Sequence, residues 1–155
     1  MPKLSKGGKY VYGWAIISAD GEIPLPPEGA GEYDLDGPRD LIVIEGSGAS
    51  GGFGVSRKDR LAESPLNVIL ERYDELAGTP EGEPVLVEGR SKIYARVPLN
   101  GEGRLQFTRE ILSAFGLRTG DKLLALRGSN IALSFAASGP IIDEASAHPE
   151  LEVVE

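Results

Sequence analysis

The sequence predicts a mainly β domain with short helices, built from two copies of a single motif. Glycine and proline are both frequent, with 21 and 11 among 155 residues, and together they favour short strands joined by tight turns over long helices. When the sequence is aligned with itself at an offset of 82 positions, residues 12–56 match residues 94–138 without a gap. An internal repeat of this kind constrains the fold more strongly than local propensity does.

The two copies agree in their apolar positions as well as in identical residues. Nine of the 45 aligned pairs are identical, where about three are expected by chance at ordinary composition. A slip of one residue would turn every strand side chain to the other face, so unrelated segments do not keep their apolar faces in register. The matching apolar pairs are Ile17/Leu99, Ile23/Leu105, Leu25/Phe107, Tyr33/Phe115, Ile42/Leu124 and Ile44/Leu126.

The repeat also predicts how the chain is organised. A length of 155 residues suits one compact domain, and we expect residues 1–155 to form one. Repeat one covers about 9–56 and repeat two covers about 91–140. A connector, 57–90, joins the repeats, and an acidic tail, 141–155, follows them.

Each repeat begins with two strands joined by a turn that contains glycine. The first strands are predicted at Tyr10–Ser18 and Ile93–Leu99, and the short second strands at Glu22–Leu25 and Arg104–Phe107. Glycine suits the turns between them because it tolerates the backbone angles that tight turns require.

Repeat two continues with one helix and two more strands. The helix is expected from about Thr108 to Phe115, with Thr108 as its N-cap and Gly116 just beyond its end. Strands follow at Lys122–Arg127 and Ile131–Phe135, joined by a tight turn of glycine, serine and asparagine.

Three further segments have less regular patterns. Residues 24–31 of repeat one are rich in proline and glycine, and two of the glycines each weaken a helix by about 1 kcal/mol relative to alanine, so we expect a loop or a single turn. The connector contains a predicted helix at Pro65–Ala77, with Ser64 as N-cap and an apolar stripe at helical spacing. The tail residues Asp143–Glu155 contain no basic residue and are expected to be frayed.

Composition excludes several functional classes. The chain has no cysteine, which excludes disulfides, thiolate metal sites and thiol nucleophiles. The only histidine, His148, precedes a proline in the tail, and no catalytic triad or dinucleotide-binding pattern occurs. We therefore expect no enzymatic activity, no cofactor and no metal. No apolar run is long enough for a secretory signal or a membrane span, so we expect a cytoplasmic protein without a membrane partner.

Two stretches of repeat two follow the pattern of a known superfamily. Gly103–Ile111 reads as Gly-Arg, an apolar strand and the start of a helix, and Gly116–Leu123 reads Gly-Leu-Arg-Thr-Gly-Asp-Lys-Leu. In both stretches repeat two resembles the AbrB/MazE/SpoVT superfamily, whose members interleave the hairpins of two motifs into one small barrel. The resemblance implies a pseudo-two-fold swapped-hairpin barrel formed by two internal repeats, similar to the tandem-repeat MraZ proteins, as a monomeric pseudo-dimer or a homo-oligomer.

The resemblance also implies a function. Members of the superfamily typically bind DNA through arginines beside the second strand and along the helix, so we expect a transcriptional regulator or an antitoxin-like DNA-binding protein. Arg104 matches the arginine that follows the glycine, and Arg109 is an additional base nearby. Arg96 and Arg118 are expected to support them from the rim. The usual helix arginine is replaced by Leu112.

The distribution of charge leaves a second interpretation open. Residues 12–56 carry a net charge of −7 and residues 94–138 carry +3, within a chain of net charge −8. Glu22 occupies the position of the strand arginine in repeat one, and an ion pair with Glu110 is an alternative role for Arg109. DNA binding is therefore expected to be weak and steeply salt-dependent. The alternative is a binding or scaffold module that kept the fold, lost DNA contact and binds a protein partner.

Overall fold

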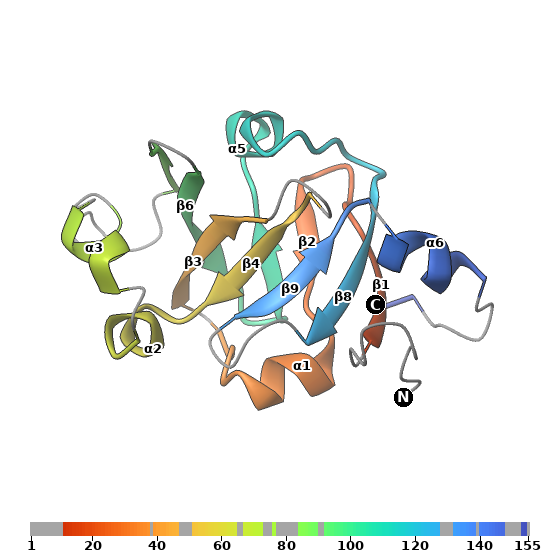
Figure 1. Ribbon diagram of the computed structural model, residues 1–155, viewed down its shortest axis with the longest axis horizontal. Helices are drawn as coiled ribbons and strands as arrows, with labels where there is room; N and C mark the ends of the chain where they lie inside the picture. Colours follow the sequence, from red (N-terminus) through yellow and green to blue (C-terminus); the bar gives the residue numbers. More distant parts are fainter. Residues whose placement is uncertain are drawn as a thin grey trace.

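The computed structural model forms a nearly closed antiparallel β-barrel with short helices around it (Figure 1). It describes residues 11–37, 39–46, 51–64, 67–72, 76, 84–89, 92–127, 132–138, 140–147 and 153–154. The strands are β1 (Val11–Ile16), β2 (Glu22–Pro24), β3 (Arg39–Glu45), β4 (Phe53–Ser56), β5 (Val85–Glu88), β6 (Ile93–Leu99), β7 (Arg104–Gln106), β8 (Lys122–Arg127) and β9 (Leu133–Ala136). The helices are α1 (Pro27–Glu32), α2 (Lys58–Ala62), α3 (Val68–Arg72), α5 (Arg109–Ala114) and α6 (Pro140–Ser146).

Pairs of neighbouring strands from the two repeats alternate around the barrel. The strand order is β1-β8-β9-β4-β3-β6-β7-β2, with β5 added on the outer edge of β6. The long pairings β1–β8 and β3–β6 and the shorter pairings β2–β7 and β4–β9 all join one repeat to the other. The amide of Ser18 donates to the carbonyl of Glu22 at 2.9 Å, which brings β2 back to the end of β1 and nearly closes the ring.

The strand registers follow the 82-residue offset through most of the barrel. Trp14 pairs with Leu124 in β1–β8, and the residues 82 positions from them, Arg96 and Ile42, pair in β6–β3. The registers no longer correspond at the hairpins β3–β4 and β8–β9, because the β3–β4 turn spans two more residues than the β8–β9 turn. Every described strand except β5 lies in one of the two predicted repeats.

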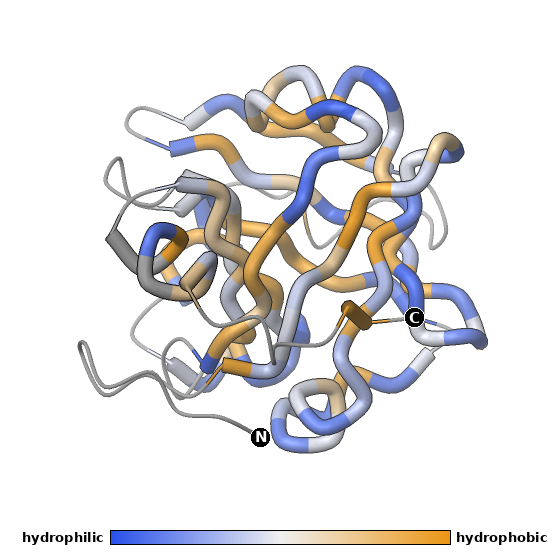
Figure 2. Tube along the Cα trace, turned by 90° about the vertical axis from the view of Figure 1, so that its right-hand side faces the viewer, coloured by the Kyte–Doolittle hydropathy of each residue, from blue (hydrophilic) through white to orange (hydrophobic). Residues whose placement is uncertain are grey.

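The barrel interior is filled by aromatic and aliphatic side chains from both repeats. Phe53 stacks on Phe135 with ring centroids 4.9 Å apart, and it also contacts Phe107 at 5.2 Å and Phe115 at 6.3 Å. Figure 2 shows apolar stretches running through the central strands and polar stretches on the outer turns. Because one phenylalanine of repeat one packs against three of repeat two, the two repeats share a single core.

The predicted strands and the predicted helix of repeat two are largely confirmed. The strands Ile93–Leu99 and Lys122–Arg127 have the predicted bounds, and the other strands differ from the expected ones at their ends. Helix α5 lies within the predicted range, and the Thr108 hydroxyl oxygen caps it by accepting a hydrogen bond from the Ile111 amide at 3.1 Å. Tyr10 and Ile131, at the ends of two predicted strands, lie outside the described residues.

The proline- and glycine-rich segment of repeat one forms a helix, so the predicted loop or single turn was wrong. Pro27 occupies the first turn of α1, where its missing amide costs nothing. Gly29 is buried, and a β-carbon there would lie 3.1 Å from both Leu133 and Tyr12. The glycine that weakens the isolated helix therefore lets α1 pack closely on the barrel, and this packing outweighs local propensity.

The described parts of the connector and of the tail pack against the barrel. Helix α3 lies inside the predicted helix Pro65–Ala77, whose residues 65, 66, 73–75 and 77 lie outside the described part of the chain. The tail was expected to be frayed, yet α6 buries Ala145 in an apolar cluster with Trp14. The Val154 amide also donates to the Trp14 carbonyl at 2.7 Å, so contact with the barrel orders what composition alone would leave mobile. No helix in the described ranges is long and apolar enough to cross a membrane.

Helices α1 and α5 end in the same way. At the end of α5, Gly116 adopts a φ of 71° and its amide donates to the Ser113 carbonyl at 3.0 Å, while the Leu117 amide donates to the Leu112 carbonyl at 2.8 Å. This is a Schellman motif, which satisfies the last helix carbonyls and brings Leu112 and Leu117 together.

At the corresponding position of α1 stands Asp34, with a φ of 55°, the only described non-glycine residue with positive φ. The Leu35 amide donates to the Ala30 carbonyl at 2.8 Å, as in the Schellman motif of α5. The Asp34 carboxylate pairs with Arg60 at 2.8 Å. Aspartate tolerates the left-handed region better than most residues do, so both helices keep the same termination.

A hydrogen-bonded ion pair ties α1 to the barrel. The Glu32 carboxylate accepts a hydrogen bond from the Tyr12 hydroxyl at 2.7 Å and from Arg127 through three N–H contacts of 2.7 to 3.1 Å. The Arg127 guanidinium, followed by the Tyr12 hydroxyl, holds the pKa of Glu32 below its usual range. Burial, followed by the bond to Glu32, raises the pKa of Tyr12. The network links α1 to β1 and β8.

The lowered pKa of Glu32 predicts a loss of stability in acid. A carboxyl group whose pKa is lower in the folded state stabilises fully above its ordinary pKa, and that contribution disappears as pH falls through the folded value. Glu32→Gln should therefore reduce stability at pH 7 and flatten the decline of stability between about pH 5 and pH 3, measured by urea unfolding. Glu110→Gln on the exposed face of α5 is the matched control. An unchanged acid decline in Glu32→Gln would contradict the role of this network.

The termination of α5 predicts a purely backbone effect at Gly116. A β-carbon at Gly116 would touch nothing within 4 Å, yet an L-residue at positive φ costs about 1–2 kcal/mol. Gly116→Ala should lower the free energy of unfolding by that amount. Gly101→Ala is the control, since its β-carbon also meets open space and its φ is not in the left-handed region. Equal effects of the two substitutions would show that the φ at Gly116 is not what constrains this helix end.

Candidate functional site

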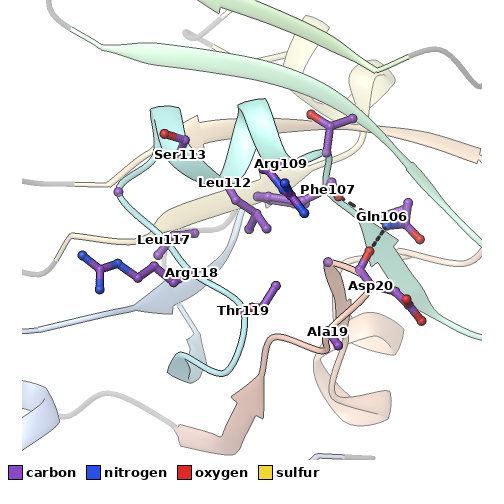
Figure 3. Close-up of a pocket in the computed structure, with 13 residues that line it drawn as sticks. Ala19, Asp20, Gln106, Phe107, Arg109, Leu112, Ser113, Leu117, Arg118 and Thr119 are labelled. Carbon is purple, nitrogen blue, oxygen red and sulfur yellow. Dashed lines mark hydrogen bonds between the residues drawn. The ribbon is translucent and has the colours of Figure 1, made fainter.

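An open cleft of about 880 Å³ lies beside α5 (Figure 3). Three segments form it: the β1–β2 turn of repeat one, the chain from the end of β7 through α5, and the loop that follows α5. The cleft therefore lies where the two repeats meet. Its lining residues are Ala19, Asp20, Gly21, Gln106, Phe107, Thr108, Arg109, Leu112, Ser113, Gly116, Leu117, Arg118 and Thr119.

The β1–β2 turn is held against the end of β7. The Gln106 side-chain amide donates to the Asp20 carbonyl at 2.7 Å, and the Phe107 amide donates to the Gly21 carbonyl at 3.0 Å. Gly21 has a φ of 81°, and a β-carbon there would lie 2.6 Å from the Phe107 carbonyl oxygen. Glycine is required at this point by both the backbone angle and the close approach, and it fixes the first wall of the cleft.

The loop after α5 is held against the residue that follows β1, just before the β1–β2 turn. The Gly120 amide donates to the Ile17 carbonyl at 2.7 Å, and the Ile17 amide donates to the Asp121 carbonyl at 3.0 Å. Within the loop, the Arg118 amide donates to the Asp121 carboxylate at 2.9 Å. These bonds fix the second wall, so the cleft does not depend on a freely moving loop.

The floor of the cleft is apolar and its rim is polar. Phe107, Leu112 and Leu117 are each at most 5% exposed and form the floor. The contact between Leu112 and Leu117 is the one that accompanies the Schellman motif at the end of α5. Hydroxyl groups of Ser113 and Thr119 stand at the exposed rim.

Two of the four predicted DNA-binding arginines line this cleft. Arg109 and Arg118 are both exposed, and neither forms an ion pair with any carboxylate of the described residues. The alternative role of Arg109, an ion pair with Glu110, is thus not seen. Figure 3 shows Arg109 projecting over the middle of the cleft, while Arg118 points outward from the opposite wall.

Arg104 lies on β7 next to the cleft, and carboxylates already flank it. Its side chain is 40% exposed, and its guanidinium lies 4.0 Å from Glu22 and 3.8 Å from Glu102. At these distances the ion pairs are loose and exposed, so each contributes little and does not prevent Arg104 from turning toward another anion.

Arg96 lies inside the protein, which corrects the expectation that it supports DNA binding from the rim. Its side chain is 4% exposed, with Nε 3.4 Å from the Asp40 carboxylate, and its guanidinium donates to the Leu76 carbonyl at 3.5 Å. Arg96 lies in the middle of β6, and β5 and the other described parts of the connector cover this side of the barrel. Arg96 thus fastens the connector to the barrel.

The corresponding place in repeat one has a different character. Gly37 stands 82 positions before Thr119, and its backbone packs so closely on Asn100 that a β-carbon would clash with the Asn100 carbonyl. The neighbouring carboxylates of Asp34 and Asp36 are 60% and 77% exposed and pair with arginines of their own surroundings. The large cleft beside α5, with two exposed arginines, thus corresponds to a surface near α1 that carries exposed carboxylates and a smaller cleft of about 200 Å³ at Asp34.

Apart from Arg109 and Arg118, the residues that shape the cleft were not predicted from the sequence. Gln106, Ser113 and Thr119 replace a proline and two glycines at the matching positions of repeat one, and this replacement is the one signal that the alignment offered. In the part of the chain that the structure describes, no group of three histidine or acidic side chains is placed to hold a metal. His148 lies outside the described residues.

Comparisons with protein-family models, with curated proteins and with solved structures found no match for this chain. The geometry of the cleft therefore carries the functional argument. Its three defining features are an apolar floor from repeat two between walls from both repeats, a hydroxyl-bearing rim, and two exposed arginines without an ion pair to any described carboxylate.

Proposed function

We propose that this chain is a DNA-binding regulator of AbrB-like architecture, in which one chain forms the pseudo-dimer and one half of it contacts DNA. The cross-repeat strand pairings and the registers that recur at an offset of 82 residues support the swapped-hairpin arrangement. The motifs Gly103–Ile111 and Gly116–Leu123, which carry the resemblance to that superfamily, border the cleft.

The observation that carries the proposal is the exposure of Arg109 and Arg118 on one cleft without ion pairs to the described residues. Guanidinium groups bind phosphate oxygens through paired N–H donors, and such contacts provide most of the affinity of DNA-binding proteins. Arg104 borders the same region and adds a third cation. The DNA-contacting set is therefore Arg104, Arg109 and Arg118, without Arg96.

Three cations imply weak binding. The logarithm of affinity falls with the logarithm of salt concentration by about 0.9 for each phosphate neutralised, so three contacts give a slope of about −2.7. A symmetric DNA reader places two competent halves on two half-sites. Repeat one offers Asp34 and Asp36 at the matching surface, which repels phosphate, so only one half-site is contacted.

A second candidate function is a binding module that takes a protein partner instead of DNA. The observation that favours it is the position of Arg104 between Glu22 and Glu102, because two nearby carboxylates compete with phosphate for that arginine. Under this alternative the barrel is a scaffold, and the exposed carboxylates Asp34 and Asp36 near α1 are available to a protein partner.

A duplex titration tests the proposal. We expect a random-sequence duplex to bind the native chain at about 50 mM salt, and Arg109→Ala/Arg118→Ala to weaken binding at least tenfold and reduce the salt slope by about 1.8. Both residues are exposed, so the variant should fold, which circular dichroism checks. Arg39→Ala, which removes an exposed arginine paired with Asp36 in repeat one, is the matched control and should bind as the native chain does.

Two outcomes would overturn the DNA-binding proposal. The first is absence of duplex binding by the native chain at low salt. The second is an equal affinity and an equal salt slope for the native chain and the double variant. Either result would favour the binding module.

A further inference from the structure

The turn between β6 and β7 contains an asparagine followed by a glycine, Asn100 and Gly101. The Gly103 amide donates to the Asn100 carbonyl at 3.2 Å, and Gly103 has a φ of 79°. A turn followed by a glycine at positive φ is a common way to close a hairpin. Asn100 is half-buried, whereas Gly101 and Glu102 are exposed. The turn therefore presents the peptide bond between Asn100 and Gly101 to solvent.

We propose that Asn100 is a site of spontaneous covalent modification, at which its side-chain amide is converted to a carboxylate through a cyclic imide. The Gly101 backbone nitrogen attacks Asn100 Cγ and loses its proton to water. The bond from Cγ to Nδ2 breaks, and the departing nitrogen takes a proton from water and leaves as ammonia.

Hydrolysis of the imide completes the reaction. Water adds to one of the two imide carbonyls and breaks its bond to the Gly101 nitrogen, which regains a proton. Depending on which carbonyl reacts, the product at position 100 is an aspartate or an isoaspartate. The conversion consumes water alone and needs no oxidant, cofactor or second protein, so the inference goes beyond DNA binding and does not depend on it.

The Gly101 amide is available as the nucleophile. Among the residues that the structure describes, it has no hydrogen-bond acceptor. A β-carbon at Gly101 would meet nothing within 4 Å, so no neighbouring group blocks this nitrogen, and glycine itself has no side chain that would crowd the attack. The other two asparagines of the sequence, Asn67 and Asn130, precede the β-branched residues valine and isoleucine.

The Asn100 side-chain carbonyl is held by groups that stabilise the intermediate of this reaction. Its Oδ1 atom accepts the Glu102 amide at 2.8 Å and the Arg104 amide at 3.0 Å. Attack on Cγ places negative charge on Oδ1, and preorganised N–H donors stabilise such a charge. The leaving nitrogen, Nδ2, has one long contact of 3.4 Å to the Glu22 carboxylate, so little holds it in place.

The matching turn of repeat one shows that the hairpin does not require this reactive pair. Ser18 stands 82 positions before Asn100, and its hydroxyl oxygen accepts the Glu22 amide at 3.0 Å. Asn100 Oδ1 accepts the Arg104 amide in the same way. Ala19 stands at the position of Gly101. A serine therefore serves as the acceptor in this type of turn, without an amide that can react.

The modification changes a contact between the two repeats. The Asn100 side chain donates to Glu22 across the repeats, and a carboxylate at position 100 replaces this donor by a second negative charge. Glu22 also lies 4.0 Å from Arg104. Like charges at this spacing repel each other, so the modified turn is less stable and carries more negative charge beside an arginine of the proposed DNA-contacting set.

Peptide mapping of the full chain by mass spectrometry tests the inference. After incubation in mildly alkaline buffer, we expect the mass change from amide to acid at Asn100, with both isomers of the product, and none at Asn67. The rate should rise with pH, because the Gly101 nitrogen must lose its proton. It should also lie within about tenfold of the rate in guanidinium chloride at the same pH, because the folded turn keeps the nucleophile accessible and the carbonyl polarised.

Three variants separate chemistry from structure. Gly101→Ala keeps the turn, since its β-carbon meets open space, and should slow the conversion at least tenfold by crowding the nitrogen. Asn100→Ser should keep the fold, as Ser18 does in repeat one, and release no ammonia. Asn100→Asp reproduces one product and should unfold at a lower denaturant concentration than Asn100→Ser, because it adds the charge beside Glu22.

Three results would overturn the inference. The first is a folded chain that keeps its Asn100 amide while the unfolded chain loses it, which would show that the fold protects this residue. The second is equal conversion at Asn67, and the third is an unchanged rate in Gly101→Ala. If Asn100 is converted and the chain binds no duplex, DNA binding fails and the modification site stands.

Discussion

The pairing of strands of one repeat with strands of the other is the constraint on which the rest of the structure depends. β1 forms its ladder with β8, and β6 forms its ladder with β3. Among the described strands β1 has no ladder partner in its own repeat, so it cannot be stable without repeat two, because an unpaired buried N–H or C=O group is costly. The shared core agrees with this, since Phe53 of repeat one packs on three phenylalanines of repeat two. The cleft is a consequence as well: repeat one supplies the β1–β2 turn and repeat two supplies α5.

The two repeats share the same strand arrangement, yet equivalent positions carry chemically different side chains. Trp14 on β1 lies under the Lys122 ammonium, 4.4 Å from its ring centroid. At the positions 82 residues away, Arg96 and Asp40 form a buried ion pair. The edge segments differ too, since Val153 bridges to β1 in parallel whereas β5 covers β6 in antiparallel register. Trp14 is buried beside the Lys122 cation, and Arg96 is buried beside the Asp40 carboxylate. The barrel therefore keeps its shape while its two outer edges present different surfaces.

Features that depend on local contacts could be predicted from the sequence, whereas features that depend on tertiary contacts could not. Strand positions and the Thr108 cap follow from side-chain alternation and capping preferences, which a sequence displays directly. Helix α1 could not be predicted in this way, because the close packing of Gly29 on Tyr12 and Leu133 is a tertiary contact that overrides a poor helix propensity. Arg96 was misplaced for a similar reason, since nothing in repeat two indicates that the connector covers it. At the cleft, Arg109 and Arg118 could be found from their motifs, but the opposite wall comes from a segment about 90 positions earlier, and the fold alone brings it there.

Whether an arginine already forms an ion pair matters more than the net charge of the chain for its availability to an anion. In repeat one and the connector, Arg39, Arg57 and Arg60 each lie within 3.2 Å of a carboxylate. Such arginines are less available, because a ligand must first replace an existing hydrogen-bonded partner. At physiological salt the Debye length is about 8 Å, so acids on the far side of the barrel are largely screened at the cleft. The overall charge of −8 would therefore slow the approach of an anion more than it would weaken the contact of that anion with Arg109, whose energy depends on local geometry.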